Sequence, residues 1–551
     1  MKKFLPGLFL FILGASLIYE AILDTPTYDE PANMAAAFSY VYKNDYRLYP
    51  DNPPFVKLLA GLTLLPIKNN IHFPGNLESY VSSSKFDLYA FGRDFLYKSG
   101  NKAEEIIFLM RIPNILFTIF LGILLYFFAK DLYGKNAGLL ALFFYSLDPN
   151  IRGHGHVLSF DIPFAFFVLM AFYLTFKLFK NPNKKLFYTF LISFSLSLAI
   201  LTKFTALFFI IFFVVFIFLK KRNYAFLIPS VVLTPFIVIW LFAFLTNYNA
   251  KTFDYDKLPI IQSAHQELKD SKMWKLINAL PVPYFYKAGI QTMYVHNIIS
   301  QPAYLLGEVH AKNDWFFYFP ASFLLKTPVP ILIFIVLALY ISFRRNFNYP
   351  PFVIGFSFLL FMMIFSHINN VYRYLFPAYV FFLLGASQSI KFINLKKPIV
   401  VFSGAILLGY MITTSFFSFP YDLSYTNELT GIPPKGYKYL SDSEVDWGQD
   451  LGRLAKFLDE NNLNKEPVLL SYLGTADPLY YGIKYKPLRF EDLDKLKGIV
   501  VISVGNLTLG DWQFRASPDY KSSILKAPLD DVRKKEPLVI IGKSIFVYDF
   551  R

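Results

Sequence analysis

Several charged side chains border the apolar blocks of this sequence, and they are of the types needed for acid–base chemistry and phosphate binding. Asp29 and Glu30 stand together directly after the first apolar run, and Asp161 opens a later one. Lys203 and Arg373 are lone basic residues in short turns between apolar runs. An ionised carboxylate can take a proton from a hydroxyl, and Lys and Arg bind phosphate. This set predicts a site for a substrate that carries a hydroxyl and a phosphate.

Further titratable residues in the same stretches extend the candidate phosphate-binding set, because a charge at a membrane edge is costly and is a functional candidate by default. They are Lys57, Arg152, His154, His156 and Lys326. The two histidines lie two residues apart in a Gly-rich turn, which is not a zinc-ligand spacing. We expect no metal-ligand residues and no defined cofactor, although a divalent metal at the acidic site stays open.

Each candidate also has a purely structural alternative. Asp29 could cap the helix that begins at Pro31, and Asp161 could cap the helix that contains Pro163. Lys203 could extend to lipid headgroups, and Arg373 could bind anionic lipid. These alternatives weaken together if the residues converge on one face of one helix bundle.

The elements that position these residues are membrane helices. Of 551 residues, 55% are hydrophobic and 19% aromatic, and the apolar residues form blocks of roughly 18 or more, the length of a membrane-spanning helix. We predict a polytopic α-helical membrane protein with about eleven transmembrane helices. The blocks lie near residues 4–23, 106–129, 137–149, 159–179, 187–201, 204–219, 224–246, 320–343, 351–366, 374–390 and 398–418. The first resembles a signal peptide but lacks a clean cleavage site, so we interpret it as a retained helix.

The basic residues predict the orientation. Lys and Arg are concentrated near residues 2–3, 130–135, 177–185, 220–222, 344–345 and 391–397, which the positive-inside rule places in the cytoplasm. The N-terminus is then cytoplasmic, and the net charge of +15 reflects these loops, so no nucleic-acid partner is expected. The chain has no cysteine, which leaves its redox compartment open.

Two domains are predicted. Residues 1–418 form the transmembrane domain, whose larger outer loops are 24–105 and 247–319. Residues 419–551 alternate β-rich runs such as "KGIVVISVG" with helical ones such as "GQDLGRLAKFLDENN", which indicates a small extracytoplasmic α/β domain.

The ordered series of motifs resembles a family: the protein O-mannosyltransferase-like membrane glycosyltransferases (glycosyltransferase family 39-like), which include the aminoarabinose transferases. "YDEPANMAAAFSYV" looks like the first outer loop of that family, and "SLDPNIRGHGHVLSFDIPFAFF" is similar to its second motif. "DNPPFVKLLAGL", "LTKFTALF", "WFFYFPASFLLKTPVP", "YRYLFP" and "SDSEVDWGQDLGRLAKFL" extend the likeness along almost the whole chain.

The resemblance implies a C-type glycosyltransferase fold and an inverting, mannosyltransferase-like enzyme of the cell membrane. It would transfer a sugar from a polyprenyl-phosphate donor to an acceptor hydroxyl of a protein Ser/Thr, a lipid or a glycan on the outer face. By position, Asp29 would be the base or acceptor-orienting carboxylate with Glu30 beside it, Asp161 the second acid, and Lys203 and Arg373 the contacts to the carrier phosphate. Some relatives have Lys or His before the Pro-Pro pair, where this sequence has Asn52.

Two other classes compete with an enzyme. A transporter or flippase of a lipid-linked glycan would show inverted repeats and broken helices at the midplane, and we find no repeat in the sequence. A non-enzymatic scaffold could bind glycan through tail aromatics such as Trp447, although a single Trp is more often a core residue.

Overall fold

The computed structural model describes residues 4–75, 87–245, 266–298, 302–310, 315–345, 350–369, 371–392, 397–489, 492–493, 496–515 and 529–551. Parts of the predicted outer loops 24–105 and 247–319 therefore lie outside the described residues.

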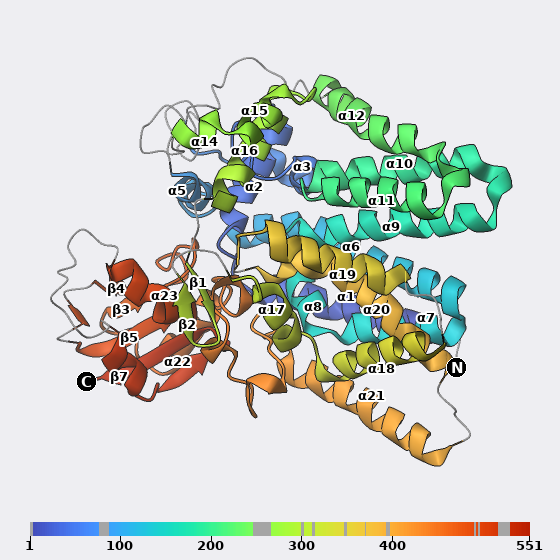
Figure 1. The fold of residues 1–551 in the computed structure, drawn as a ribbon. Helices are drawn as coiled ribbons and strands as arrows, with labels where there is room; N and C mark the ends of the chain where they lie inside the picture. Colours follow the sequence, from blue (N-terminus) through green and yellow to red (C-terminus); the bar gives the residue numbers. More distant parts are fainter. Residues whose placement is uncertain are drawn as a thin grey trace.

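Long apolar helices run side by side and form most of the molecule (Figure 1). They are α1 (Leu5–Leu23), α6 (Ala103–Tyr133), α7 (Lys135–Leu147), α9 (Asp161–Lys180), α10 (Lys185–Thr202), α11 (Ala206–Lys220), α12 (Leu227–Leu245), α17 (Tyr318–Lys326), α18 (Val329–Arg345), α19 (Pro350–Phe365), α20 (Phe376–Ser387) and α21 (Pro398–Ser418). Every predicted apolar block is helical, and the chain is a multi-pass membrane protein.

Fewer helices are long enough to span a membrane than the sequence predicted. Among the described residues, six helices are long and apolar enough, or up to seven if the bent pair α17 and α18 counts as one span. The predicted span 320–343 is broken, because α17 and α18 meet at 115°. Thr327 between them is extended, with ψ 128°, as expected for the residue before a proline.

Helix α20 lies at the centre of the bundle, and all of its residues are buried. It packs on α19 through a reciprocal pair of glycines and phenylalanines. A Cβ at Gly355 of α19 would lie 2.8 Å from the Phe382 ring, and one at Gly385 of α20 would lie 2.7 Å from the Phe352 ring. Only glycine permits this approach, which fixes the short turn between the two helices where Arg373 lies.

Shorter elements gather mostly at one end of the bundle. They are α2 (Glu30–Phe38), η1 (Ser39–Lys43), α3 (Phe55–Leu62), η2 (Leu65–Asn70), α5 (Leu88–Arg93), η3 (Asp94–Lys98), α8 (Pro149–Gly155), α14 (Gln266–Asp270), α15 (Lys272–Ala279), α16 (Tyr284–Ile298), β1 (Ala303–Leu305), β2 (Glu308–His310) and η7 (Tyr372–Leu375). Figure 1 shows α2, α5, α14, α15 and α16 at the same end as the C-terminal sheet.

The C-terminal part contains a five-stranded sheet in the order β4-β3-β5-β7-β6. Its elements are α22 (Leu451–Glu460), β3 (Val468–Ser471), β4 (Tyr485–Pro487), β5 (Gly498–Ser503), α23 (Val504–Arg515), α24 (Asp530–Lys534), β6 (Val539–Ile541) and β7 (Ile545–Phe550). Strand β3 is parallel to β4 and β5, and β7 is antiparallel to β5 and β6.

The two faces of the sheet have different neighbours. Val501 packs with Leu454 of α22, whereas its neighbour Val500 belongs to the large core that includes the membrane helices. Successive side chains of a strand point to opposite faces, so the continuously apolar strand β5 contributes to the core on each face of the sheet.

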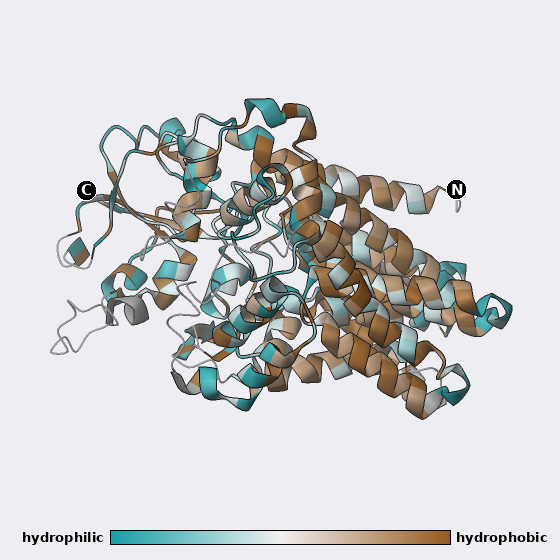
Figure 2. Cartoon of the chain, turned by 90° about the horizontal axis from the view of Figure 1, so that it is seen from above, coloured by the Kyte–Doolittle hydropathy of each residue, from teal (hydrophilic) through white to brown (hydrophobic). Residues whose placement is uncertain are grey.

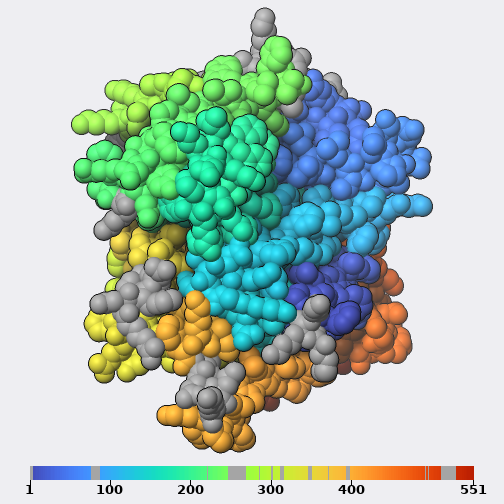
Figure 3. Space-filling model, turned by 90° about the vertical axis from the view of Figure 1, so that its right-hand side faces the viewer, coloured from blue at the N-terminus to red at the C-terminus, as the bar shows by residue number. Residues whose placement is uncertain are grey.

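The other end of the bundle is formed by short polar turns, which include η4 (Pro182–Lys184), η5 (Arg222–Tyr224) and η8 (Gln388–Lys391). Figure 2 shows apolar helices between these hydrophilic turns and the hydrophilic segments at the sheet end. Figure 3 looks onto this end, where the N-terminal helix and segments from the middle of the chain share one face.

Candidate active site

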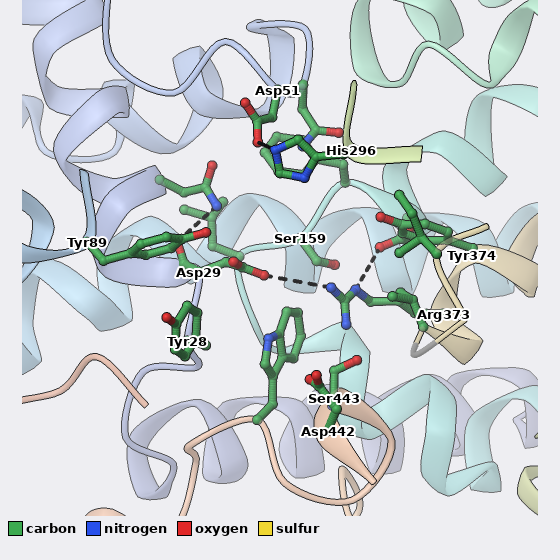
Figure 4. A pocket seen from close by; sticks show the side chains of 18 of the residues that line it. Tyr28, Asp29, Asp51, Tyr89, Ser159, His296, Arg373, Tyr374, Asp442 and Ser443 are labelled. Carbon is green, nitrogen blue, oxygen red and sulfur yellow. Dashed lines mark hydrogen bonds and ion pairs between the residues drawn. The ribbon is translucent and has the colours of Figure 1, made fainter. Parts of the chain in front are cut away.

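A cavity of about 460 Å³ lies where the segment after α1, the turn before α9, helix α16, η7 and the C-terminal part meet. Four predicted site residues line it: Asp29, Asp161, Lys203 and Arg373. They come from segments far apart in the sequence, and Figure 4 shows Asp29 and Arg373 pointing toward each other across the cavity. Packing thus brings together the two acids and the two cations that the sequence singled out.

Asp29 directs its carboxylate into the cavity. Its Oδ1 accepts a hydrogen bond of 3.3 Å from the Tyr49 hydroxyl, and its Oδ2 lies 3.7 Å from Arg373 Nη2. Among the described residues it makes no side-chain capping bond to α2, although it occupies the N-cap position. The structural alternative of a helix cap therefore does not describe this side chain.

Asp161 forms ion pairs with both Lys203 and Arg373. Its Oδ1 pairs with Lys203 Nζ, and its Oδ2 lies 3.4 Å from Arg373 Nε. Asp161 is the first residue of α9 and is not its cap. Lys203 Nζ also lies 3.6 Å from the centre of the Tyr374 ring, so it is enclosed by a carboxylate and an aromatic face.

Arg373 has a hydrogen-bond donor that is unsatisfied among the described residues. It is 9% exposed, and its guanidinium carbon lies 3.7 Å from the centre of the Trp447 ring. Its Nη1 is buried and has no hydrogen-bond partner in the part of the chain that the structure describes. Leaving a buried charged donor unsatisfied is costly, and an anionic ligand in the cavity would supply the missing acceptor.

Burial shifts the titration of the two groups that face the cavity. Burial raises the pKa of Asp29 above its ordinary value, against opposing effects of the Arg373 charge, the Tyr49 hydroxyl and Trp447. Burial lowers the pKa of Lys203, although Asp161 opposes this shift. A raised carboxylate pKa strengthens Asp29 as a base once it is ionised.

Glu30 does not join Asp29 in the cavity. It is fully buried, and its carboxylate accepts bonds of 2.9 and 2.6 Å from Arg111 and of 2.8 Å from the backbone N–H groups of Thr27 and Leu158. These bonds tie the segment before α2 to the turn that leads into Asp161. The position fits a residue that shapes the site and does not fit contact with a substrate.

The other predicted phosphate-binding residues are not among the described residues that line the cavity, and each has partners elsewhere. Lys57 is buried, donates to the Tyr49 carbonyl and lies over the Tyr40, Tyr49 and Phe160 rings; burial lowers its pKa to about 7. Lys326 donates to the carbonyls of Leu423 and Glu444.

The Gly-rich turn after α7 forms buried contacts as well. Arg152 binds Asp422 with both oxygens, at 2.6 and 3.1 Å. His156 lies 3.0 Å from Asp24 Oδ2. His154 is buried beside Phe376 and Trp447, and neither of its ring nitrogens has a hydrogen-bond partner in the described part.

Several lining residues were not predicted from the sequence. They are Tyr28, Tyr49, Asp51, Tyr89, His296, Asp442, Ser443 and Asn506. Asp51 lies 3.7 Å from His296 on the side of the cavity opposite Ser443 (Figure 4). Asn52, which precedes the Pro-Pro pair, also lines the cavity. The Pro-Pro and "SDSEVDWGQD" motifs pointed to these segments but not to the individual side chains.

No group of three or more His, Asp or Glu side chains among the described residues is placed to hold a metal ion. Asp161 already pairs with two cations, and Asp29 faces Arg373.

The geometry defines a multi-pass membrane protein with a cavity at one end of its helices that is lined by two aspartates, a lysine and an arginine. Residues 103–247 match the family model of the dolichyl-phosphate-mannose-protein mannosyltransferases. This segment runs from α6 to α12 and contains Asp161 and Lys203. The resemblance to protein O-mannosyltransferase-like membrane glycosyltransferases is thereby confirmed, and the matched segment carries half of the acid–cation cluster.

Individual proteins show more distant likenesses. An uncharacterized protein of Aquifex aeolicus (strain VF5) is 32% identical over 114 residues, and the match spans only 20% of this chain and 22% of that protein. ArnT from Cupriavidus metallidurans in the apo state has a TM-score of 0.49 at 11% identity, over 98% of this chain and 97% of that one. The archaeal oligosaccharyltransferase AglB from Archaeoglobus fulgidus, in complex with an inhibitory peptide and a dolichol-phosphate, has a TM-score of 0.47 at 10% identity, over 92% of this chain and 70% of that one.

Proposed function

We propose that this protein is a membrane glycosyltransferase that moves a sugar from a polyprenyl-phosphate donor to an acceptor hydroxyl. The observation that carries the proposal is the cavity at the end of the membrane helices, where Asp29 faces Arg373 and Lys203 pairs with Asp161. The family-model match over residues 103–247 supports it, because the matched proteins act on dolichyl-phosphate-mannose. A lipid phosphate at this depth would leave its tail in the bilayer and its head in the cavity.

In the proposed reaction, the acceptor oxygen attacks the anomeric carbon of the donor sugar and transfers its proton to the Asp29 carboxylate. The bond between the anomeric carbon and the phosphate oxygen breaks, and polyprenyl phosphate leaves with the electron pair. Arg373 and Lys203 stabilise the negative charge of the departing phosphate, with Asp161 holding both cations in place. One such displacement inverts the anomeric centre, and the family resemblance favours a mannosyl-type donor.

The basic turns at one end of the bundle support an outward-facing cavity at the other end. The basic turns η4 and η5 lie opposite the sheet end, where the cavity is. By the positive-inside rule, the N-terminus is cytoplasmic and the cavity and residues 419–551 face outward. The acceptor is then a protein Ser/Thr, a lipid or a glycan at the outer surface of the cell membrane.

The test is turnover of a polyprenyl-phosphate mannose by the purified protein in liposomes. Release of polyprenyl phosphate that depends on an added acceptor, with inverted stereochemistry in the product, supports the proposal. Mass spectrometry of surface glycoconjugates from cells with and without the protein identifies the acceptor. A protein that moves the intact lipid-linked sugar across the bilayer without breaking the glycosyl bond would be a flippase, and the proposal would be wrong.

A further inference from the structure

The C-terminal part is bonded directly to the segment that carries Asp29. The Thr25 N–H donates to the Gln449 carbonyl at 3.0 Å, and the Tyr28 N–H donates to the Trp447 carbonyl at 2.8 Å. The Thr475 hydroxyl donates to the Tyr28 carbonyl at 2.7 Å. Residues on the N-terminal side of the catalytic carboxylate are therefore paired with residues more than four hundred positions later, and Trp447 is at the centre of this pairing.

Trp447 is held firmly in this position. It is 5% exposed and packs with Val157 and Leu423, with Tyr28 against the same cluster. Its backbone N–H donates to the Gln449 side chain at 2.7 Å. Contacts on its edges and bonds at both of its backbone groups leave the ring little freedom to turn.

One ring face of Trp447 is covered by the Arg373 guanidinium at 3.7 Å. An aromatic face attracts a cation and also prevents the long arginine side chain from rotating away. The stack therefore fixes the plane of the guanidinium while its Nη1 stays without a hydrogen-bond partner among the described residues.

His154 packs against Trp447, the residue that contacts Arg373. Its ring centre lies 6.1 Å from that of Trp447 and 5.3 Å from that of Phe376. Burial, together with the charges of Lys326, Arg373 and His156, holds the pKa of His154 well below its usual range. A neutral imidazole does not repel Arg373, whose guanidinium lies near Trp447, Tyr374 and the two aspartates.

We propose that Trp447 is a positioning residue, which holds Arg373 in the orientation that binds the donor phosphate. The C-terminal part is then a working component of the cavity, because it sets the affinity for the lipid carrier. This inference rests on the proposed function, since it assigns the phosphate of the polyprenyl donor to Arg373. It predicts that removing the indole weakens phosphate binding through Arg373, whereas the hydrogen bond of the Trp447 side chain to Asp29 acts separately on the proposed base.

The test is a double-mutant cycle on the full-length protein, with binding of polyprenyl phosphate measured at equilibrium in nanodiscs. Trp447→Leu should weaken binding about tenfold, and Trp447→Phe, which keeps a smaller ring face, should weaken it less. Trp447→Leu combined with Arg373→Gln should bind no more weakly than Arg373→Gln alone, because the indole has then lost the group it positions. The part of the effect that acts through Arg373 should appear in KM for the donor.

The matched control is Trp274→Leu. Trp274 is equally buried, at 6% exposed, but packs against Tyr294 and is not among the described residues that line the cavity. It should leave the affinity unchanged. If Trp447→Leu does not fold, the cycle with Trp447→Phe decides, since a loss of affinity that vanishes in the Arg373→Gln background supports the same conclusion.

Two results would overturn the inference in different ways. Wild-type affinity in a folded Trp447→Leu variant, or losses that simply add in the double variant, would contradict the positioning role and leave the glycosyltransferase proposal intact. A wild-type protein that does not bind polyprenyl phosphate at all would remove the proposed function, and this inference with it.

Discussion

Asp29→Asn is the substitution that separates a catalytic from a structural carboxylate. Asparagine keeps the size of the side chain, and its carbonyl oxygen can still accept the 3.3 Å hydrogen bond from the Tyr49 hydroxyl. It removes the charge that faces Arg373 at 3.7 Å, but Arg373 keeps its second carboxylate partner, Asp161. The local structure should therefore survive while the ability to take a proton is lost.

The expected loss of turnover is roughly 10²–10⁴-fold, the usual contribution of a general base. This corresponds to about 3–5 kcal/mol of activation free energy at about 1.4 kcal/mol per tenfold change. The stability of the Asp29→Asn protein should rise slightly or stay unchanged. Burial raises the pKa of Asp29 in the folded protein, so its ionised form is disfavoured by folding, and that penalty grows as the pH rises through the folded pKa. At neutral pH the neutral asparagine avoids this penalty.

The assay is release of polyprenyl phosphate from the donor, on protein whose thermal unfolding has been recorded first. Asp131→Asn is the control, because Asp131 also binds a tyrosine hydroxyl and a lysine but lies at the end of α6 away from the cavity. It should keep full turnover. The wild-type rate should also fall as the pH drops toward the raised pKa of Asp29, and this acidic limb should disappear in the variant. Near-normal turnover of a folded Asp29→Asn protein would refute the assignment.

Three further predictions concern the surroundings of the base. Lys203→Gln should weaken polyprenyl-phosphate binding about 10- to 100-fold, the value of a charge-assisted hydrogen bond. Because burial lowers the pKa of Lys203, the wild-type affinity should also fall as the pH becomes alkaline. A binding titration that finds neither effect contradicts this role. Arg111→Met should destabilise the protein by about 3–5 kcal/mol, since it leaves the buried Glu30 carboxylate unpaired. Adding Glu30→Gln should recover part of the lost stability, measured by thermal unfolding. Stability losses that simply add in the double variant would argue against the pairing. Because the chain has no cysteine, the single variants Lys184→Cys and Lys465→Cys can each be labelled with an impermeant maleimide. The cysteine at position 184 should react only from the cytoplasm, and the one at position 465 only from outside. Labelling of both from the same side would reject the topology.

Local sequence determined much of this protein. Continuous apolar blocks must become helices in a bilayer, because backbone groups cannot be left without hydrogen bonds there, and each predicted block is helical in the structure. Charges at the edges of these blocks are costly, so the short set of exceptions in the sequence already contained Asp29, Asp161, Lys203 and Arg373. The length of an apolar run did not fix the path of its helix, as the 115° break between α17 and α18 shows.

Tertiary structure decided which of these charges face a ligand and which neutralise each other. Lys57, Arg152 and Glu30 carry the same kinds of charge as the groups in the cavity, but packing gave each of them a carbonyl, a carboxylate or an arginine as a partner. A pairing such as Arg152 with Asp422 joins residues 270 positions apart, and no spacing rule reaches that far. The stack of Trp447 on Arg373 is likewise a contact that the sequence did not predict. Such contacts depend on how helices and sheet are packed together, because a buried charge is stabilised only by the groups that the fold brings next to it.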